Sequence, residues 1–122
     1  MVSVDEAAAA VAGLCSSDIM EMRAYVRPHP RLEKVMMAVA ILLSKESDSW
    51  DEIRPLLADP NGFKAMVQGL ERSAISADQI ERLQVFVSDP DFTVDNLNCM
   101  SIVAAKLCAW VIAVNAEYQA QH

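Results

Sequence analysis

The chain has 122 residues, of which 53% are hydrophobic and only 3 are glycine. This length suits one domain with a modest core, and the abundance of alanine, leucine, valine and methionine favours an all-α fold. The net charge of -7 leaves no basic stripe for nucleic acid. No apolar run reaches the roughly 18 residues that a membrane-spanning helix requires, and the acidic start of the chain does not have the pattern of a secretory signal peptide.

Catalytic and metal-binding patterns are missing from the sequence. The three cysteines, Cys15, Cys99 and Cys108, are widely spaced, so we interpret them as reduced packing residues of an intracellular protein. Neither His29 nor His122 lies near a cysteine at the spacing of metal ligands. The glycines stand alone rather than in a phosphate-binding loop, and no nucleophile and base constellation is readable. We therefore expect no enzyme activity, no cofactor and no metal.

One long helix is predicted over residues 4–27, because this segment is rich in alanine and contains no proline. Core-type residues recur along it every three or four positions, as in a heptad seam with one extra residue between Cys15 and Ile19. At about 1.5 Å per residue, such a helix is roughly 36 Å long. A small domain cannot cover that length, so we expect part of this helix to project as a coiled-coil strand.

Two prolines one residue apart, Pro28 and Pro30, predict a turn after this helix. Each lacks a backbone N–H and disfavours helix in the residue before it, and Pro30 suits the first position of a new helix. The helix that follows, over residues 30–44, has almost no polar face beyond its first turn. We expect it to be the central helix of the core.

Two short helices are predicted next. The pattern from Ser49 to Glu52 is typical of a capping box, and it starts a helix that should reach about Ala58 and bend at Pro55. Residues 59–62 predict a turn. A further helix is expected over residues 63–70.

The last part of the chain predicts two more helices with a short element between them. A second capping box, from Ser76 to Gln79, opens a helix that should end near Val87. Residues 93–96 should cap a single turn, and a long helix then runs from about position 96, or a few residues later, to near the C-terminus. Apolar residues follow this helix as an unbroken heptad seam: Leu97, Met100, Ala104, Leu107, Val111, Val114 and Tyr118.

Together these elements predict an all-α fold, a small helical bundle at the tip of a two-helix antiparallel coiled coil. We expect the outgoing coiled-coil helix at residues 1–27 and the bundle at 28–98. Residues 99–122 should form a last helix that runs from the bundle into the returning coiled-coil strand. One seam contains an insertion and the other does not, so the pattern leaves their mutual register open.

Five stretches of the chain carry a family resemblance through their order and spacing. They are residues 17–23 with Pro28-His29-Pro30; residues 34–43; Trp50-Asp51 with Leu56-Leu57 and 59–61; residues 89–93; and residues 107–111. No single motif is specific, but together they span nearly the whole chain. In this arrangement the chain resembles the microtubule-binding domain at the tip of the dynein heavy-chain stalk.

The resemblance implies a non-catalytic domain that binds the groove between the tubulin subunits of a microtubule, while the ATPase lies elsewhere in the motor. It also implies that the two stalk helices slide past each other by about one helical turn, roughly 5 Å. This sliding would switch the domain between weak and strong binding, with Pro28 and Pro30 as the hinge. The acidic sequence suits axonemal dyneins better than cytoplasmic ones, so we expect a location in the cytoplasm on the cytoskeleton, in the axoneme of a cilium or flagellum.

Carried over position by position, the resemblance gives seven candidate microtubule contacts: Arg31, Lys34, Lys64, Asn98, Cys99, Ile102 and Lys106. The sequence departs from the family at Ala65, Cys99 and Ile102, where basic residues are usual. Because the tubulin surface is acidic and electrostatic steering toward it raises association rates, these missing charges predict weak binding. Each missing exposed pair is worth only about 0–1 kcal/mol, but several together could lower the affinity by an order of magnitude.

A second interpretation stays open, in which the domain keeps the dynein fold but mainly docks an accessory chain and binds microtubules weakly. Some outer-arm members of the family bind a leucine-rich-repeat light chain at this domain. Exposed Cys99 and Ile102 would suit such a partner, and the same two residues would equally suit packing in the interior. An enzyme is the least favoured interpretation, and neither nucleic acid nor a membrane is an expected partner.

Overall fold

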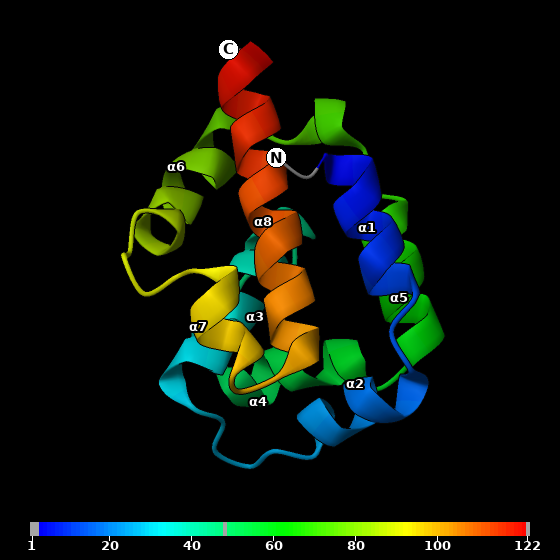
Figure 1. The fold of residues 1–122 in the computed structure, drawn as a ribbon. Helices are drawn as coiled ribbons and strands as arrows, with labels where there is room; N and C mark the ends of the chain where they lie inside the picture. The colour runs from blue at the N-terminus through cyan, green and yellow to red at the C-terminus, as the bar shows by residue number, and fades with distance from the viewer. Residues whose placement is uncertain (1–2, 48, 122) are drawn as a thin grey trace.

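The computed structural model describes residues 3–47 and 49–121, and these residues form an all-helical fold (Figure 1). The all-α prediction is therefore confirmed for the described part of the chain. Its α-helices are α1 (Val4–Ala12), α2 (Ser16–Arg23), α3 (Pro30–Leu42), α4 (Trp50–Ile53), α5 (Pro60–Gln68), α6 (Ala77–Val87), α7 (Val94–Asn98) and α8 (Ile102–Gln121), with short 3-10 helices η1 (Arg54–Leu57) and η2 (Arg72–Ala74).

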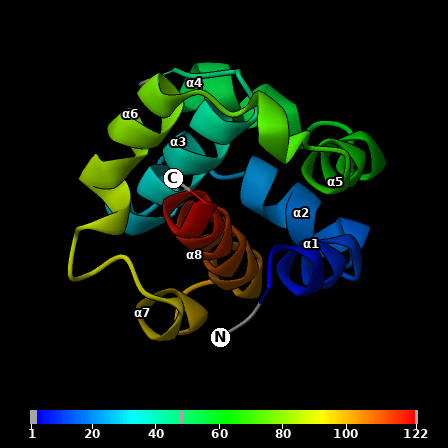
Figure 2. The ribbon, with the colours of Figure 1, turned by 90° about the horizontal axis from the view of Figure 1, so that it is seen from above.

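Helix α8 runs through the middle of the bundle, with α1 and α5 on one side and α6 and α7 on the other (Figures 1 and 2). Four members of the predicted seam that lie on α8 are fully or almost fully buried: Ala104, Leu107, Val111 and Val114. Leu97, the first member of that seam, is buried as well but belongs to α7. Side chains between the seam positions are buried as well, Trp110 and Cys108 among them. Over most of its described length α8 is therefore a core helix enclosed by several others, rather than one strand of a two-helix coiled coil.

The prediction of one continuous helix over residues 4–27 is wrong. Helix α1 ends at Ala12, and the N–H of Gly13 donates to the carbonyl of Ala9 at 3.0 Å. Cys15 is extended, and α2 starts at Ser16. Glycine weakens a helix and serine favours its start, and here these local preferences outweigh the alanine run. The break, at residues 13–15, thus lies just before the extra residue of the heptad pattern.

Because of this break, α2 turns across one end of the bundle instead of continuing α1 (Figure 1). Both helices pack against the core, since Val4, Val11 and Ile19 are buried. Helix α1 lies beside α8 and runs antiparallel to it (Figures 1 and 2). An antiparallel pair is therefore present in the described residues, whereas the expected projecting rod is not. The division into segments 1–27, 28–98 and 99–122 stays a prediction.

The proline corner and the helix after it agree with prediction. Residues 24–29 are not helical, and Pro30 occupies the first turn of α3. Helix α3 ends at Leu42, close to the expected position, and Ser44 then adopts the left-handed region with φ 60°. Most of its side chains beyond the first turn are buried, so the core position predicted for α3 is confirmed.

The two predicted capping boxes have different outcomes. At the start of α6, Ser76 and Gln79 exchange the expected pair of side-chain to backbone hydrogen bonds. Ser49 also precedes its helix, but its side chain makes no cap bond. Instead the Ser47 hydroxyl donates to Glu52 and accepts the N–H of Ser49.

The segment around the two middle prolines also has mixed outcomes. The predicted irregularity at Pro55 is confirmed, because α4 gives way to the 3-10 helix η1 at Arg54. The predicted turn at residues 59–62 is wrong, because Pro60 already begins α5. A proline is readily accepted at a first helical position, where its missing N–H would have no helical partner.

One continuous apolar cluster fills the bundle, and every α-helix of the described chain contributes to it. Its largest fully buried side chains include Trp110, Phe63 and Met36. Among the described residues, no helix combines the length and the apolar character needed to cross a membrane.

Candidate functional site

The end of the bundle that carries the proline corner is formed by α2, the start of α3, α7 and the first turn of α8 (Figure 1). We call this end the tip and define its candidate surface by Arg31, Lys34, Asn98, Cys99 and Ile102. The first and last described residues lie at the opposite end, formed by the start of α1 and the end of α8 (Figure 1). We call that end the stalk end. Five of the seven predicted contact residues are therefore at the tip.

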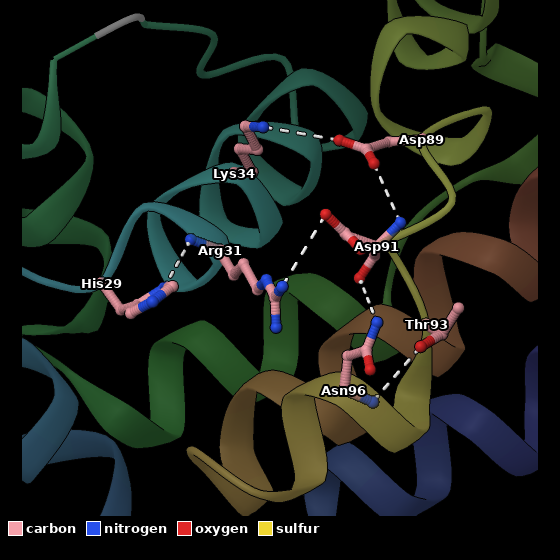
Figure 3. A network of polar contacts seen from close by, with 7 residues as sticks. All are labelled: His29, Arg31, Lys34, Asp89, Asp91, Thr93 and Asn96. Carbon is pink, nitrogen blue, oxygen red and sulfur yellow. Dashed lines mark hydrogen bonds and ion pairs between the residues drawn. The ribbon is translucent and has the colours of Figure 1, made fainter.

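Helix α3 presents two cations at the tip. His29 caps the helix, and its Nδ1 accepts the N–H of Arg31 at 3.1 Å (Figure 3). Lys34 follows Arg31 by three positions, which places the two side chains on neighbouring parts of one helix face. The side chains of Arg31 and Lys34 are 38% and 51% exposed. Both can therefore reach a partner outside the chain.

Two aspartates of the loop between α6 and α7 already pair with these cations (Figure 3). The guanidinium of Arg31 lies 3.7 Å from the carboxylate of Asp91, and Lys34 Nζ lies 3.4 Å from Asp89. Asp89 also accepts the N–H of Asp91 at 2.9 Å. This backbone hydrogen bond is the main cause of a lowered pKa of Asp89; Lys34 lowers it further, and desolvation opposes both.

The loop that carries these aspartates is anchored to α7. Asn96 Nδ2 donates to the carbonyl of Asp91 at 3.2 Å, and the Asn96 N–H donates to Thr93 Oγ1 at 3.2 Å (Figure 3). Phe92, between the two bonded positions, is buried. A cavity of about 180 Å³ separates the loop from the start of α3 and is lined in part by Arg31 and Lys34. The acidic side chains are thus held next to the cations.

The remaining tip residues are exposed and uncharged. Asn98 and Cys99 are exposed at the end of α7, and Ile102 is 51% exposed at the start of α8. Ile102 borders a second cavity of about 200 Å³, together with the acidic residues Asp18 and Glu21 of α2. Of the two alternatives left open for Cys99 and Ile102, surface exposure is confirmed and interior packing is wrong.

The other two predicted contacts lie outside the five residues that define the tip surface. Helices α5 and α7 lie on opposite sides of α8 in both views (Figures 1 and 2). Lys64 belongs to α5, and its Nζ donates to the carbonyl of Leu14. Lys106 is half-buried, one turn beyond Ile102, and has no hydrogen-bond or ion-pair partner among the described residues. Lys64 is thus engaged within the chain, and Lys106 is available.

A hydrogen bond ties the segment that contains the predicted hinge to α4. Trp50 Nε1 donates to the carbonyl of Tyr25 at 2.8 Å and so joins α4 to the segment between α2 and α3. Pro28 is half-buried and Pro30 is exposed. The hinge role of these two prolines stays a prediction.

Sequence reasoning missed the acidic half of this site. Asp89 and Asp91 flank Pro90, and that pattern predicts only the end of a helix. Their partner cations lie far away along the chain, 55 residues in the case of Lys34. No sequence signal indicates such a pairing. Among the described residues, no group of three or more histidine, cysteine or acidic side chains is placed to hold a metal ion.

Comparison with known proteins adds independent information. A family model described as the microtubule-binding stalk of dynein motor matches residues 2–121. Human dynein axonemal heavy chain 14 is 33% identical over 117 residues, 96% of this chain and 3% of the relative. Human dynein axonemal heavy chain 2 is 32% identical over 112 residues, 92% of this chain and 2% of the relative.

A third relative comes from Chlamydomonas reinhardtii. The dynein-1-beta heavy chain of its flagellar inner arm I1 complex is 30% identical over 109 residues, 89% of this chain and 2% of the relative. The chain therefore spans only 2–3% of the length of these curated relatives. The matched region is a non-catalytic part of the motor. Because the family model covers almost every residue, this chain belongs to the family of microtubule-binding stalk domains of dynein motors.

Proposed function

We propose that this domain grips the microtubule with its tip, and that Arg31 and Lys34 are its main cationic contacts. The observation that carries this proposal is the placement of both cations, each partly exposed, on one face of α3 at the tip. Asn98, Cys99 and Ile102 flank them, and Lys106 adds a cation one turn further along α8. Lys64 contributes only when it leaves the carbonyl of Leu14.

The internal ion pairs suggest that binding is weak. Arg31 and Lys34 must exchange Asp91 and Asp89 for acidic groups of tubulin, so part of the attraction is offset. Exposed pairs are worth only about 0–1 kcal/mol each, so the exchange is feasible but brings little net gain. The net charge of -7 adds long-range repulsion from an acidic surface. Because salt screens both the local attraction and the long-range repulsion, we expect the affinity to change little as salt rises.

We further propose that the affinity follows the relative position of α1 and α8, which the two stalk helices would continue. The non-helical residues 24–29 separate α2 from α3, and so a displacement of the first helices need not be transmitted rigidly to α3. Pro28 and Pro30 would then act as the hinge. This supports the mechanism expected from the resemblance, in which sliding of the helices switches the grip on the track.

The test compares two lysines with the same change of charge. Lys34→Glu should weaken cosedimentation with microtubules by about tenfold, because it removes a contact and adds an acidic group, a loss equivalent to about 1.4 kcal/mol. Lys45→Glu is the matched control, because Lys45 is exposed beyond the end of α3 and outside the tip surface. Equal affinities of the two variants in matched salt would contradict the proposal.

A second candidate function is the docking of a leucine-rich-repeat light chain. The exposure of Ile102 and Cys99 favours it. An exposed apolar side chain suits an apolar patch on a light chain better than the acidic surface of a microtubule. Ile102→Lys separates the two functions. If the track is the main partner, the variant should bind microtubules more tightly; if the light chain is, it should lose light-chain binding in a purified two-component assay.

We also propose that the parent motor works in the axoneme of a cilium or flagellum, within the cytoplasmic cytoskeleton. The names of the similar proteins support this location, since two are axonemal heavy chains and one belongs to a flagellar inner arm. A tagged heavy chain that decorates the axoneme would support the proposal. Labelling confined to cell-body microtubules would contradict it.

A further inference from the structure

We propose that Arg72 is a positioning residue that latches α1 and α8 in the register seen here; this rests on the proposed function, in which sliding of these helices sets the grip on the track. Arg72 belongs to η2, at the stalk end, and lies outside the tip surface. It would therefore change microtubule binding without touching the microtubule.

The geometry joins three elements through one side chain. Arg72 Nη1 lies 3.0 Å from Asp5 Oδ1, on α1. Its Nε lies 3.0 Å from Glu117 Oε2 and 3.1 Å from Oε1, on α8. The hydrogen bond to Asp5 raises the pKa of Arg72, and both carboxylates add to this effect, so the guanidinium stays charged in both contacts. One planar guanidinium thus bridges two antiparallel helices.

The apolar contacts between the same helices specify the register poorly. Helix α1 buries Val4, Ala7 and Val11, with Ala8 half-buried beside them. A shift by four residues would replace Val4 with Ala8 and Ala7 with Val11, so no charged side chain would enter the interface. A groove of about 270 Å³ between α1 and α8 is lined on the α8 side by three alanines, Ala113, Ala116 and Ala120, and by Glu117. A change of register would therefore exchange valine and alanine in the packing, but it would bury no charge.

The ion pairs, by contrast, depend strongly on register. A shift of α1 by one helical turn moves Asp5 by about 5.4 Å along the axis. A hydrogen-bonded contact of 3.0 Å does not survive such a displacement. The guanidinium would then keep Glu117 and lose Asp5. We infer that Arg72 favours the register seen here over registers that lose its contact with Asp5.

The register can be read directly as a distance between α1 and α8. Spin labels at the exposed residues Ala9 and Gln119, with Cys15 and Cys99 changed to serine, report their separation by pulsed electron paramagnetic resonance. The buried Cys108 is left unchanged. The chain with Arg72 unchanged should give mainly one distance between the two labels. Arg72→Gln should add a second population displaced along the helix axis by about one turn, roughly 5 Å.

Two further variants make this measurement specific. Arg72→Lys should give an intermediate result, because a single ammonium replaces the fork of donors. Arg82→Gln is the matched control: Arg82 has similar exposure and pairs with Glu46 and Asp78, away from the two helices. Losing Arg72 should change the ratio of the two populations by about fivefold, as expected for loss of roughly 1 kcal/mol from exposed pairs.

Several outcomes would overturn the latch. An unchanged distance distribution in Arg72→Gln would do so, and so would the same change in Arg82→Gln. Loss of helical circular dichroism in Arg72→Gln would show that Arg72 merely holds α1 folded. In 1 M salt, where the screening length falls to about 3 Å, the second population should grow in the unmodified chain and remain unchanged in Arg72→Gln.

Microtubule cosedimentation of the same variants separates this inference from the proposed function. If the latch and the function are both correct, Arg72→Gln should differ in affinity from the unmodified chain, and Arg82→Gln should not. If no variant binds microtubules while the distances shift as expected, the proposed function fails and the latch stands. If affinities agree while the distances shift, the role of Arg72 in microtubule binding is overturned.

Discussion

The two ends of the bundle use similar ion pairs for different purposes. At the tip, Arg31 and Lys34 pair with aspartates of an adjacent loop that is anchored to α7. At the stalk end, Arg72 pairs with Asp5 of α1 and with Glu117 of α8. The tip pairs lower the free positive charge of a surface, whereas the stalk-end pairs join two helices. In our proposals, the same chemistry would tune affinity at one end and register at the other.

A continuous apolar core connects the two ends. A single apolar cluster extends from Val4 and Val114 near the stalk end to Leu32 and Leu97 near the tip. Helix α8 passes through that cluster and contributes to both ends (Figure 1). A displacement at the stalk end must therefore be accommodated by this packed core, or absorbed at the bends beside α2.

The largest effect on both ends is expected from a substitution in the core that they share. Leu107→Ala removes a fully buried side chain of α8 and should lower the free energy of unfolding by about 2–5 kcal/mol. Urea unfolding followed by circular dichroism and by tryptophan fluorescence should show one common transition. Val85→Ala on the exposed side of α6 should change stability by less than about 0.5 kcal/mol. Two separate transitions would mean that the ends do not share one core.

Thiol reactivity compares the buried core with the exposed parts of the chain. Burial raises the pKa of Cys108 to about 12, so its reactive thiolate is scarce. Cys15, at the break between α1 and α2, and Cys99, at the tip, are exposed. At about pH 8, a disulfide reagent should modify two thiols of the folded chain quickly and Cys108 only on unfolding. Rapid modification of all three thiols would show that the core around α8 opens readily.

The tip pairs can be tested by removing their acids. Asp89→Asn frees Lys34 and removes a negative charge, so it should raise microtubule affinity by up to about fivefold at low salt. Asp78→Asn is the control, because Asp78 pairs with Arg82 away from the tip. The gain should disappear at high salt. An unchanged or lower affinity would mean that the internal pairs do not compete with tubulin.

The smallest expected effect is on the pH dependence of stability. The pKa of Asp89 is lowered from 3.8 in the folded chain, so the folded state favours its ionised form. Its stabilising contribution is therefore present above about pH 4 and is lost as pH falls through the folded-state pKa. The difference in free energy of unfolding between the unmodified chain and Asp89→Asn should shrink from about pH 5 to about pH 3. A constant difference would contradict the role assigned to this carboxylate.

Local sequence was enough for many helices and for the chemistry of the tip cations. The proline corner, the capping box at Ser76 and the all-α class depend on residues a few positions apart, and so does the hydrogen bonding of a helix. The placement of Arg31 and Lys34 on one helix face follows from the same periodicity. Local signals failed where they conflicted, as at Gly13, where an alanine run met a helix break.

By itself, then, the sequence determined the helical class, most helix starts, and the family to which the chain is similar. Only the tertiary structure decided that α8 is enclosed, that Asp89 meets Lys34 across 55 residues, and that Arg72 meets Asp5 across 67 residues. Helix formation depends on neighbours within about four positions. An ion pair between distant residues depends on how whole helices pack, which these local patterns do not specify.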